Sequence, residues 1–263
     1  MGQETALLKT DMGEIALNIR VSARARRIGL RIDPRIGGAE LVLPKGVSKS
    51  SGLKFARTKW DWLCDHLSTL PIPIPFVEGA EVPFLGVPLT IRHMGRGRAL
   101  PGPVWRENDA LCVTGDPRHM TRRVHDWLKQ QARAEITARC QPKARELDVT
   151  VKGITLRDPH SRWGSCSVRG TLSFSWRLVM SPENVLDYVV AHEVAHLREM
   201  NHSARFWKHV DRLIEDSETP KAWLRLHGAG LHRFGADEIP DYRSLQTDFS
   251  DQTGLPRTVS RVP

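Results

Sequence analysis

Residues 181–202 read SPENVLDYVVAHEVAHLREMNH, and this stretch is the most informative part of the sequence about the fold. Ser181 followed by Pro182 is typical of a helix start, with the serine at the cap and the proline in the first turn. One face of the predicted helix then carries two valines and two histidines, at Val185, Val189, His192 and His196.

The segment His192-Glu193-Val-Ala-His196 predicts a metal site. Histidines four residues apart on a helix project from the same face, so both imidazoles reach one ion, and the intervening Glu193 can touch a water on that ion. This spacing fits zinc. The alternative is a buried core stripe, but polar groups removed from water on such a face must be compensated by a metal or by partners.

His202 is the candidate third ligand, because a catalytic zinc site combines three protein ligands with a water. It lies six residues beyond His196, just before Ser203, which can cap the next helix. Its rivals are His209, Glu215 and Glu218. The alternative for His202 itself is an exposed neighbour of the cap.

The mechanism that these residues predict is hydrolysis. Zinc lowers the pKa of its water toward about 7, Glu193 accepts the proton as general base, and the resulting hydroxide attacks a peptide carbonyl. Glu193 then protonates the leaving amine.

Elsewhere the hydrophobic period changes several times, and no internal repeat is evident in the sequence. Alternating apolar residues predict strands that form a small antiparallel meander at 15–21, 26–32 and 40–43, and further strands at 81–84, 87–92, 104–106, 110–114, 149–156 and 171–176. Helical spacing predicts four further helices, over 53–67, over 118–140, from Ser203 through Leu213 and from Pro220 through Leu226. The first has a candidate cap among Ser48, Ser50 and Ser51, and Pro142 ends or kinks the second. The alternating prolines at 71–75 predict an extended connector.

Composition places the chain among ordinary globular proteins, with 40% hydrophobic and 26% charged residues. No apolar run approaches the roughly 20 residues of a membrane span, and the acidic N-terminus does not resemble a signal peptide. The four cysteines, Cys64, Cys112, Cys140 and Cys166, include no C-x-x-C pair. We therefore expect a cytoplasmic protein without a membrane partner, a disulfide framework or a cysteine zinc site.

The net charge of +9 is unevenly distributed along the chain. Residues 1–147 contain 24 basic and 15 acidic side chains, whereas residues 148–263 contain 15 of each. Such asymmetry can mark an anionic partner, nucleic acid above all, although a basic surface can simply confer solubility. Five arginines cluster within 12 residues, but strand parity divides them between two faces and no aromatic residue lies among them: Arg20, Arg24, Arg26, Arg27 and Arg31.

Four linked segments together resemble the YgjP-like metallopeptidase domain family: residues 162–166 (RWGSC), 176–178 (WRL), 187–197 (DYVVAHEVAHL) and 201–207 (NHSARFW). The resemblance covers most of residues 15–230. It implies a zincin-like fold, zinc ligands at His192, His196 and His202, Glu193 as the catalytic base, and a peptide or protein substrate. The metal spacing and the RWGSC segment are more distantly similar to SprT-like and WSS-type proteases, which act on proteins crosslinked to DNA.

Further site residues have weaker signals. Arg162, Trp163 and Ser165 are candidates for lining the substrate cleft, since a glycine beside a tryptophan between two strands suggests a tight bend near the metal helix. Tyr188, one turn before His192, is a candidate for aiding an oxyanion, with a packing role as the alternative. Cys166 is a metal-approaching or a buried structural thiol, and His160 is a further polar candidate in the same loop.

We therefore predict an α+β protein in three parts. A basic, strand-rich N-terminal region spans residues 1–116, a zincin-like metallopeptidase domain spans residues 117–232, and a flexible tail spans residues 233–263. The runner-up is a nucleic-acid-associated protein, either a DNA–protein crosslink protease or a non-catalytic zinc-containing binding protein. The sequence leaves the oligomeric state open.

Overall fold

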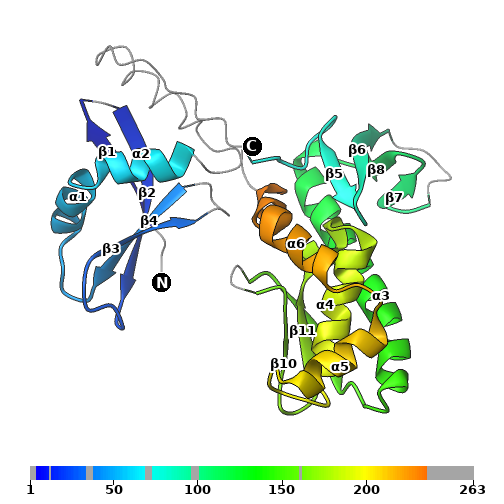
Figure 1. Ribbon diagram of the computed structural model, residues 1–263. Coiled ribbons are helices and arrows are strands. Elements are labelled where there is room, and N and C mark those ends of the chain that lie inside the picture. Colours follow the sequence, from blue (N-terminus) through cyan, green and yellow to red (C-terminus); the bar gives the residue numbers. More distant parts are fainter. Residues whose placement is uncertain are drawn as a thin grey trace, which may run out of the picture. The chain divides into compact units, whose positions relative to one another are not determined.

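The chain divides into two compact units, Met1–Pro73 with Ala236–Pro263 as unit 1 and Ile74–Gly235 as unit 2. The computed structural model describes residues 4–11, 13–33, 38–68, 73–95, 101–159 and 162–235. Helices occur together with three small sheets (Figure 1), so the predicted α+β class is confirmed.

Unit 1 is a four-stranded sheet covered by two helices. The sheet has the order β1-β2-β4-β3, from β1 (Glu4–Thr10), β2 (Gly13–Ser22), β3 (Gly29–Asp33) and β4 (Gly38–Pro44). In β2 the apolar residues alternate as the sequence predicts, with Ile15, Leu17 and Ile19 buried. The predicted meander is wrong, because β2 pairs with β4 in parallel rather than with β3. Strand β1, which pairs antiparallel with β2, was not predicted.

The predicted helix over 53–67 is two helices, α1 (Lys49–Arg57) and α2 (Trp60–Ser68). Ser48 caps α1 and accepts from the Ser51 backbone N–H at 3.2 Å. The break falls at Thr58, whose backbone N–H and hydroxyl both donate to the Phe55 carbonyl, a local bonding that competes with helix continuation. The predicted apolar stripe survives the break: Ala56, Trp60, Leu63 and Leu67 are buried against the sheet residues Leu8, Ile15 and Leu17.

Unit 2 begins with a second four-stranded sheet of order β5-β6-β8-β7, made by β5 (Glu81–Phe84), β6 (Val87–Met94), β7 (Val104–Glu107) and β8 (Ala110–Thr114). All four lie where the sequence predicts them. Asn108 and Asp109 form the turn that joins β7 to β8, with Asn108 at φ 55°. These strands belong to unit 2, so the boundary between the compact units, after residue 73, falls inside the strand-rich region of residues 1–116.

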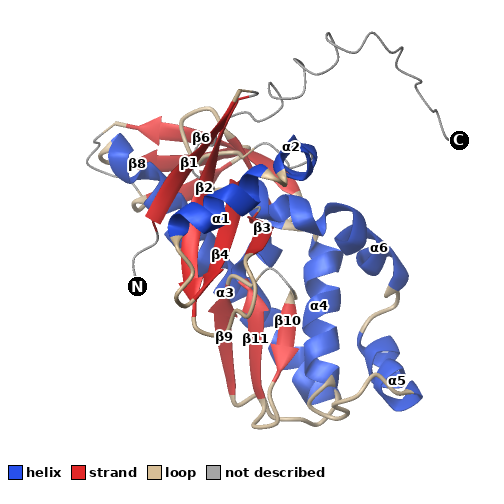
Figure 2. Ribbon diagram, turned by 90° about the vertical axis from the view of Figure 1, so that its left-hand side faces the viewer, coloured by secondary structure: helices blue, strands red, loops and turns tan. Residues whose placement is uncertain are grey.

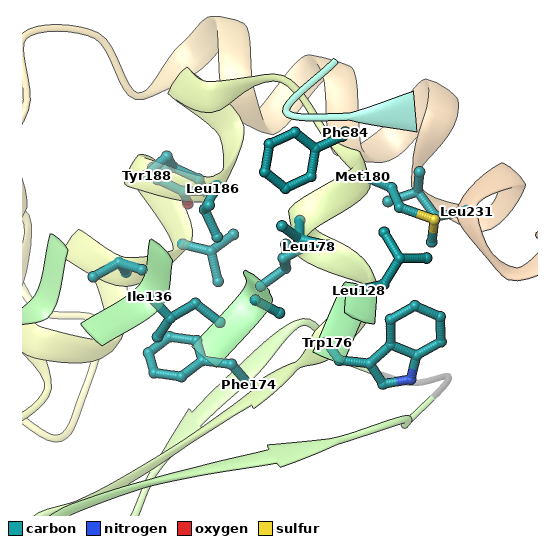
Figure 3. Packing of buried hydrophobic residues seen from close by; sticks show 14 of the residues in the cluster. Phe84, Leu128, Ile136, Phe174, Trp176, Leu178, Met180, Leu186, Tyr188 and Leu231 are labelled. Carbon is teal, nitrogen blue, oxygen red and sulfur yellow. The ribbon is translucent and has the colours of Figure 1, made fainter. Parts of the chain in front are cut away.

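The short helix η1 (Pro117–His119) leads into the 27-residue helix α3 (Met120–Glu146). Residues 124, 128, 132 and 136 of α3 are fully buried, as their spacing predicts. The helix continues through Pro142 to Glu146, so the proline does not end it. Figure 3 shows Leu128 and Ile136 of α3 packed with Leu178, between Phe84 on one side and Phe174 and Trp176 on the other.

A three-stranded sheet follows, in the order β10-β11-β9: β9 (Gly153–Arg157), β10 (Gly164–Cys166) and β11 (Thr171–Ser175). Strand β10 was not predicted and occupies one edge, antiparallel to β11. The remaining elements are η2 (Trp176–Met180), α4 (Glu183–Ala195), α5 (Ala204–Leu213), α6 (Glu218–His227) and η3 (Gly228–Arg233). Figure 2 shows α4 beside β10, with α5 and α6 on its other side.

The end of unit 2 returns to its beginning. Ile74 donates to the Arg233 carbonyl at 2.9 Å, and Gly235 donates to the Ile74 carbonyl at 2.8 Å. Residues 236–263 of the predicted tail lie outside the described residues. Among those described, no helix is long and apolar enough to cross a membrane.

Candidate metal centre

Helix α4 positions the predicted metal motif in its last turn. It contacts α3, α5, α6 and β10, and burial on nearly all sides explains its apolar sequence. His192 and Glu193 lie inside the helix, and His196 is its C-terminal cap. The N-terminal cap is Pro182, so the predicted capping by Ser181 is wrong: the Ser181 hydroxyl donates to the Leu178 carbonyl at 2.7 Å and closes η2 instead.

His202 comes from the segment between α4 and α5 and joins the two helical histidines. The ligand nitrogens of His192, His196 and His202 all lie within 4.8 Å of one another, and the Nε2 atoms of His192 and His202 are 3.1 Å apart. A tetrahedral zinc ion with Zn–N distances of about 2.0–2.1 Å places two ligand nitrogens about 3.3 Å apart. The His192–His202 distance is close to this value, and the three imidazoles together could hold one metal ion.

The helix after His202 holds these rings in place. Ser203 caps α5 as predicted, accepting from the Phe206 backbone N–H at 3.4 Å. The Phe206 ring then packs 4.9 Å from His192, 4.4 Å from His196 and 4.8 Å from His202, measured between ring centroids. His196 is additionally oriented by the hydrogen bond of its Nδ1 to the Glu199 carbonyl at 3.0 Å, which leaves Nε2 for a metal.

A histidine binds a metal ion through a neutral imidazole, and the pKa values of the two helical histidines are both lowered, which favours that form. Burial, together with the neighbouring charges of His196, His202 and Lys221, lowers the pKa of His192 to about 3. Burial also lowers the pKa of His196, against the hydrogen bond to Glu199, which raises it. His202 is exposed, so the group of three is open to solvent on one side.

Glu193 lies beside these histidines and is only 5% exposed. Burial raises the pKa of its carboxyl to about 8, and the positive charge of Arg162 opposes this rise. Its Oε2 has no hydrogen-bond partner in the part of the chain that the structure describes. A buried carboxyl group with an unpartnered oxygen and a raised pKa is a candidate general base.

Strand β10 explains the glycine in the RWGSC segment. A Cβ on Gly164 would lie 2.5 Å from Oε1 and 2.6 Å from Cγ of Glu193, so only glycine leaves room for the carboxylate. Trp163 is half-buried, stacks on His232 at 5.6 Å between ring centroids, and lies against Gly228. The segment thus sets the space around Glu193, a function that its sequence alone did not reveal.

The remaining candidates have distinct positions. Arg162 is exposed, Ser165 is half-buried in β10 opposite Ser173, and Tyr188 is only 7% exposed within the core of unit 2, with its ring 5.9 Å from His192. Burial raises the pKa of Tyr188 to about 12 and also raises that of the Cys166 thiol.

The rivals for the third ligand do not join the histidine group. His209 lies along the α5 surface, Glu218 pairs with Lys221 at 2.7 Å, and neither these residues nor Glu215 belong to the one such group found among the described residues. His160 lies outside the described residues.

Lys221 was missed by sequence reasoning. Its Nζ lies 4.1 Å from the centroid of the Trp207 ring, which in turn stacks on His202 at 6.0 Å. This ammonium group comes from α6, 19 residues beyond His202, and no local pattern in the sequence marks it.

The fold and the site define an α+β protein with a candidate three-histidine metal centre. A family model described as YgjP-like, metallopeptidase domain, matches residues 26–227, and the chain belongs to this family. Its class is therefore metallopeptidase by family, as the resemblance of the four sequence segments predicted.

Among solved structures, the crystal structure of the metallopeptidase zymogen of Pyrococcus abyssi abylysin is similar to part of the chain. The similarity covers 35% of this chain and 92% of that chain, at 18% identity and a TM-score of 0.32. No curated protein matches the chain.

Proposed function

We propose that this protein is a zinc-dependent peptidase in which His192, His196 and His202 hold the metal and Glu193 is the general base. One observation carries the proposal: the ligand nitrogens of three imidazoles converge within 4.8 Å of one another, beside the buried Glu193. The family assignment supports the class of reaction, and the donor set supports zinc, because three imidazole nitrogens with an open fourth position are typical of catalytic zinc.

A bound zinc ion supplies Lewis acidity and lowers the pKa of a coordinated water toward about 7. The chain's own residues do the rest. Glu193 receives the proton of the attacking water at its unpartnered Oε2 and delivers it to the nitrogen of the leaving amine. The Glu199 carbonyl and the Phe206 ring fix the orientation of His196, so the ligands are preorganised.

The substrate position is inferred from the sheet. Strand β10 pairs with β11 on one side, and no other described strand pairs with its outer edge. An extended peptide can add to such an edge through main-chain hydrogen bonds. Because Gly164 of β10 touches the Glu193 side chain, a peptide on this edge lies beside the general base. Ser165 and Arg162 are then within the region that contacts it, and Tyr188 remains a candidate for oxyanion stabilisation.

The test separates metal binding from chemistry. Zinc content is measured for wild type, His202→Ala and Glu193→Gln, purified without chelators or a metal-binding tag. We expect about one zinc per chain in wild type and in Glu193→Gln, and most of it lost in His202→Ala. In a broad peptide screen, Glu193→Gln should retain zinc but lose hydrolysis. Hydrolysis by Glu193→Gln would overturn the role of Glu193, and absence of zinc from reconstituted wild type would overturn the metal site.

The nucleic-acid alternative has less support. Arg20, one of the five clustered arginines, pairs with Glu40 through Nε at 2.7 Å and Nη2 at 3.2 Å, so its charge is already compensated. Arg24, Arg26, Arg27 and Arg31 are exposed, without aromatic side chains among them for base stacking.

A further inference from the structure

A concave cavity of about 420 Å³ lies between the end of α3 and helix α5, within unit 2. Its lining includes four cations, Arg198, Arg205, Lys208 and Arg212, but one carboxylate, Glu199. This basic cavity is unexpected in the second part of the chain, where residues 148–263 contain 15 basic and 15 acidic side chains. The excess of positive charge at the cavity is therefore a local feature, because this part of the chain as a whole has no net charge.

Helix α5 presents the cations because it is amphipathic. Phe206, Val210 and Leu213 are buried, and the spacing of Arg205, Lys208 and Arg212 places all three on the opposite face. An ordinary solvated helix face carries acidic residues that balance its basic ones. Here Arg205 and Lys208 form no ion pair with any residue that the structure describes, and Arg212 has a long, exposed contact of 3.4 Å with Glu146.

Arg198 is already fixed in position. Its Nε donates to the Leu147 carbonyl at 2.8 Å, and its Nη2 donates to the Asp148 carbonyl at 2.9 Å and to the Asp148 carboxylate at 3.4 Å. Because the Asp148 side chain is fully exposed, this ion pair compensates little of the Arg198 charge. Within the described residues its Nη1 makes no hydrogen bond, so one end of a rigidly held guanidinium is available. A preorganised guanidinium loses little further entropy when it binds a ligand, in contrast to a free surface arginine.

We propose that the basic cavity binds a compact anion that carries phosphate groups. Its excess of positive charge calls for a ligand with several negative charges, and guanidinium groups match phosphate oxygens through paired N–H donors. A volume of about 420 Å³ suits a small molecule of the size that protein pockets usually hold. An extended nucleic-acid duplex instead needs a long basic track along its backbone.

The experiment is isothermal titration of the zinc-loaded full chain with inorganic pyrophosphate. The test variant is Arg205→Ala/Lys208→Ala, because both side chains are exposed and unpaired within the described residues, so their loss leaves the fold intact. The matched control is Lys152→Ala/Arg169→Ala, which removes the same two residue types from exposed positions of unit 2 outside the cavity. We expect wild type and control to bind alike and the test variant to bind at least about tenfold more weakly, since it loses two charge-assisted contacts.

Three outcomes of the pyrophosphate titration would overturn the proposal. One is the absence of binding to wild type, and another is equal weakening of the test variant and the control. A third is equal binding by all three proteins, which would place pyrophosphate at the zinc ion. A parallel titration with a short DNA duplex tests the other phosphate source, and tighter duplex binding that depends on Arg205 and Lys208 would overturn the compact ligand. These readouts do not involve hydrolysis, so they are independent of the proposed peptidase activity.

Discussion

The two four-stranded sheets of this protein share one topology. Their strand orders are β1-β2-β4-β3 in unit 1 and β5-β6-β8-β7 in unit 2. In each sheet the central pair is parallel and both outer pairs are antiparallel. The sequence shows no matching repeat, because the topology requires only apolar alternation and turns at suitable places, which many sequences provide.

The helices that come after each sheet in the chain make the two regions different. The first sheet is covered by α1 and α2, two helices of nine residues, and buries a core of its own. The second sheet leads into the 27-residue α3, which places its residues in the same hydrophobic cluster as α4. The same sheet topology thus forms a self-contained unit in unit 1, whereas in unit 2 it packs in the cluster that includes the helix of the candidate metal site. The difference predicts that perturbing unit 2 affects metal and activity, whereas perturbing unit 1 affects its own stability.

The largest effect is expected from Gly164→Ala. The added methyl group would lie 2.5 Å from Oε1 of Glu193, so the carboxylate must leave its position beside the histidine group. We expect at least about a hundredfold loss of kcat/KM, as for other displaced catalytic groups, with zinc content unchanged. The control in unit 1 is Gly29→Ala in β3, where a Cβ meets nothing within 4 Å. Full activity of Gly164→Ala would show that this contact does not position Glu193.

Substitutions at equivalent core positions of the two sheets test whether the two units unfold separately. Leu17 in β2 and Leu89 in β6 are both fully buried, on topologically matched strands. Leu17→Ala and Leu89→Ala should each cost about 2–5 kcal/mol of stability in their own unit. Only Leu89→Ala should lower the temperature at which zinc is released, measured with a zinc-responsive dye during thermal unfolding. Equal lowering by both variants would mean that the two cores unfold as one.

The placement of the candidate metal motif on a helix could be predicted from the sequence because it is local. His192, Glu193 and His196 depend only on helical spacing, and Ser203 marks the helix that begins after His202. Most strands of the two four-stranded sheets could be predicted for the same reason, since alternation of buried residues is a property of each strand alone.

The features that the sequence did not reveal depend on pairing between distant segments. The parallel pair β2–β4 and the edge strand β10 are set by non-local hydrogen bonds, which strand patterns do not encode. The contact between Gly164 and Glu193 spans 29 positions in the chain and requires the fold itself. The break between α1 and α2 is local, but it leaves no mark on the hydrophobic pattern. One threonine hydroxyl competes with helix continuation, while the apolar stripe runs on without interruption.

A smaller effect concerns the pH dependence of hydrolysis. The charge of Arg162 lowers the pKa of Glu193 against the larger effect of burial. Removing that charge in Arg162→Gln therefore raises the pKa. Because Glu193 must be ionised to accept a proton, activity falls as the pH drops through this pKa, and the acidic limb of the kcat/KM profile should move to higher pH. Arg162→Lys should keep the limb in place, and so should Arg31→Gln in unit 1. A limb that stays fixed in Arg162→Gln would exclude Arg162 as an influence on the base.

The smallest effect belongs to the ion pair across β2 and β4 in unit 1. Arg20 and Glu40 lie 2.7 Å apart with side-chain exposures of 41% and 19%, so solvent screens much of their attraction. A double-mutant cycle with Arg20→Gln and Glu40→Gln should give a coupling of about 0.2–1 kcal/mol that diminishes at high salt. The zinc content should not change in any of the three variants, because both residues belong to unit 1 while all three histidines belong to unit 2. Loss of zinc from these variants would contradict the separation of roles that the two sheets indicate.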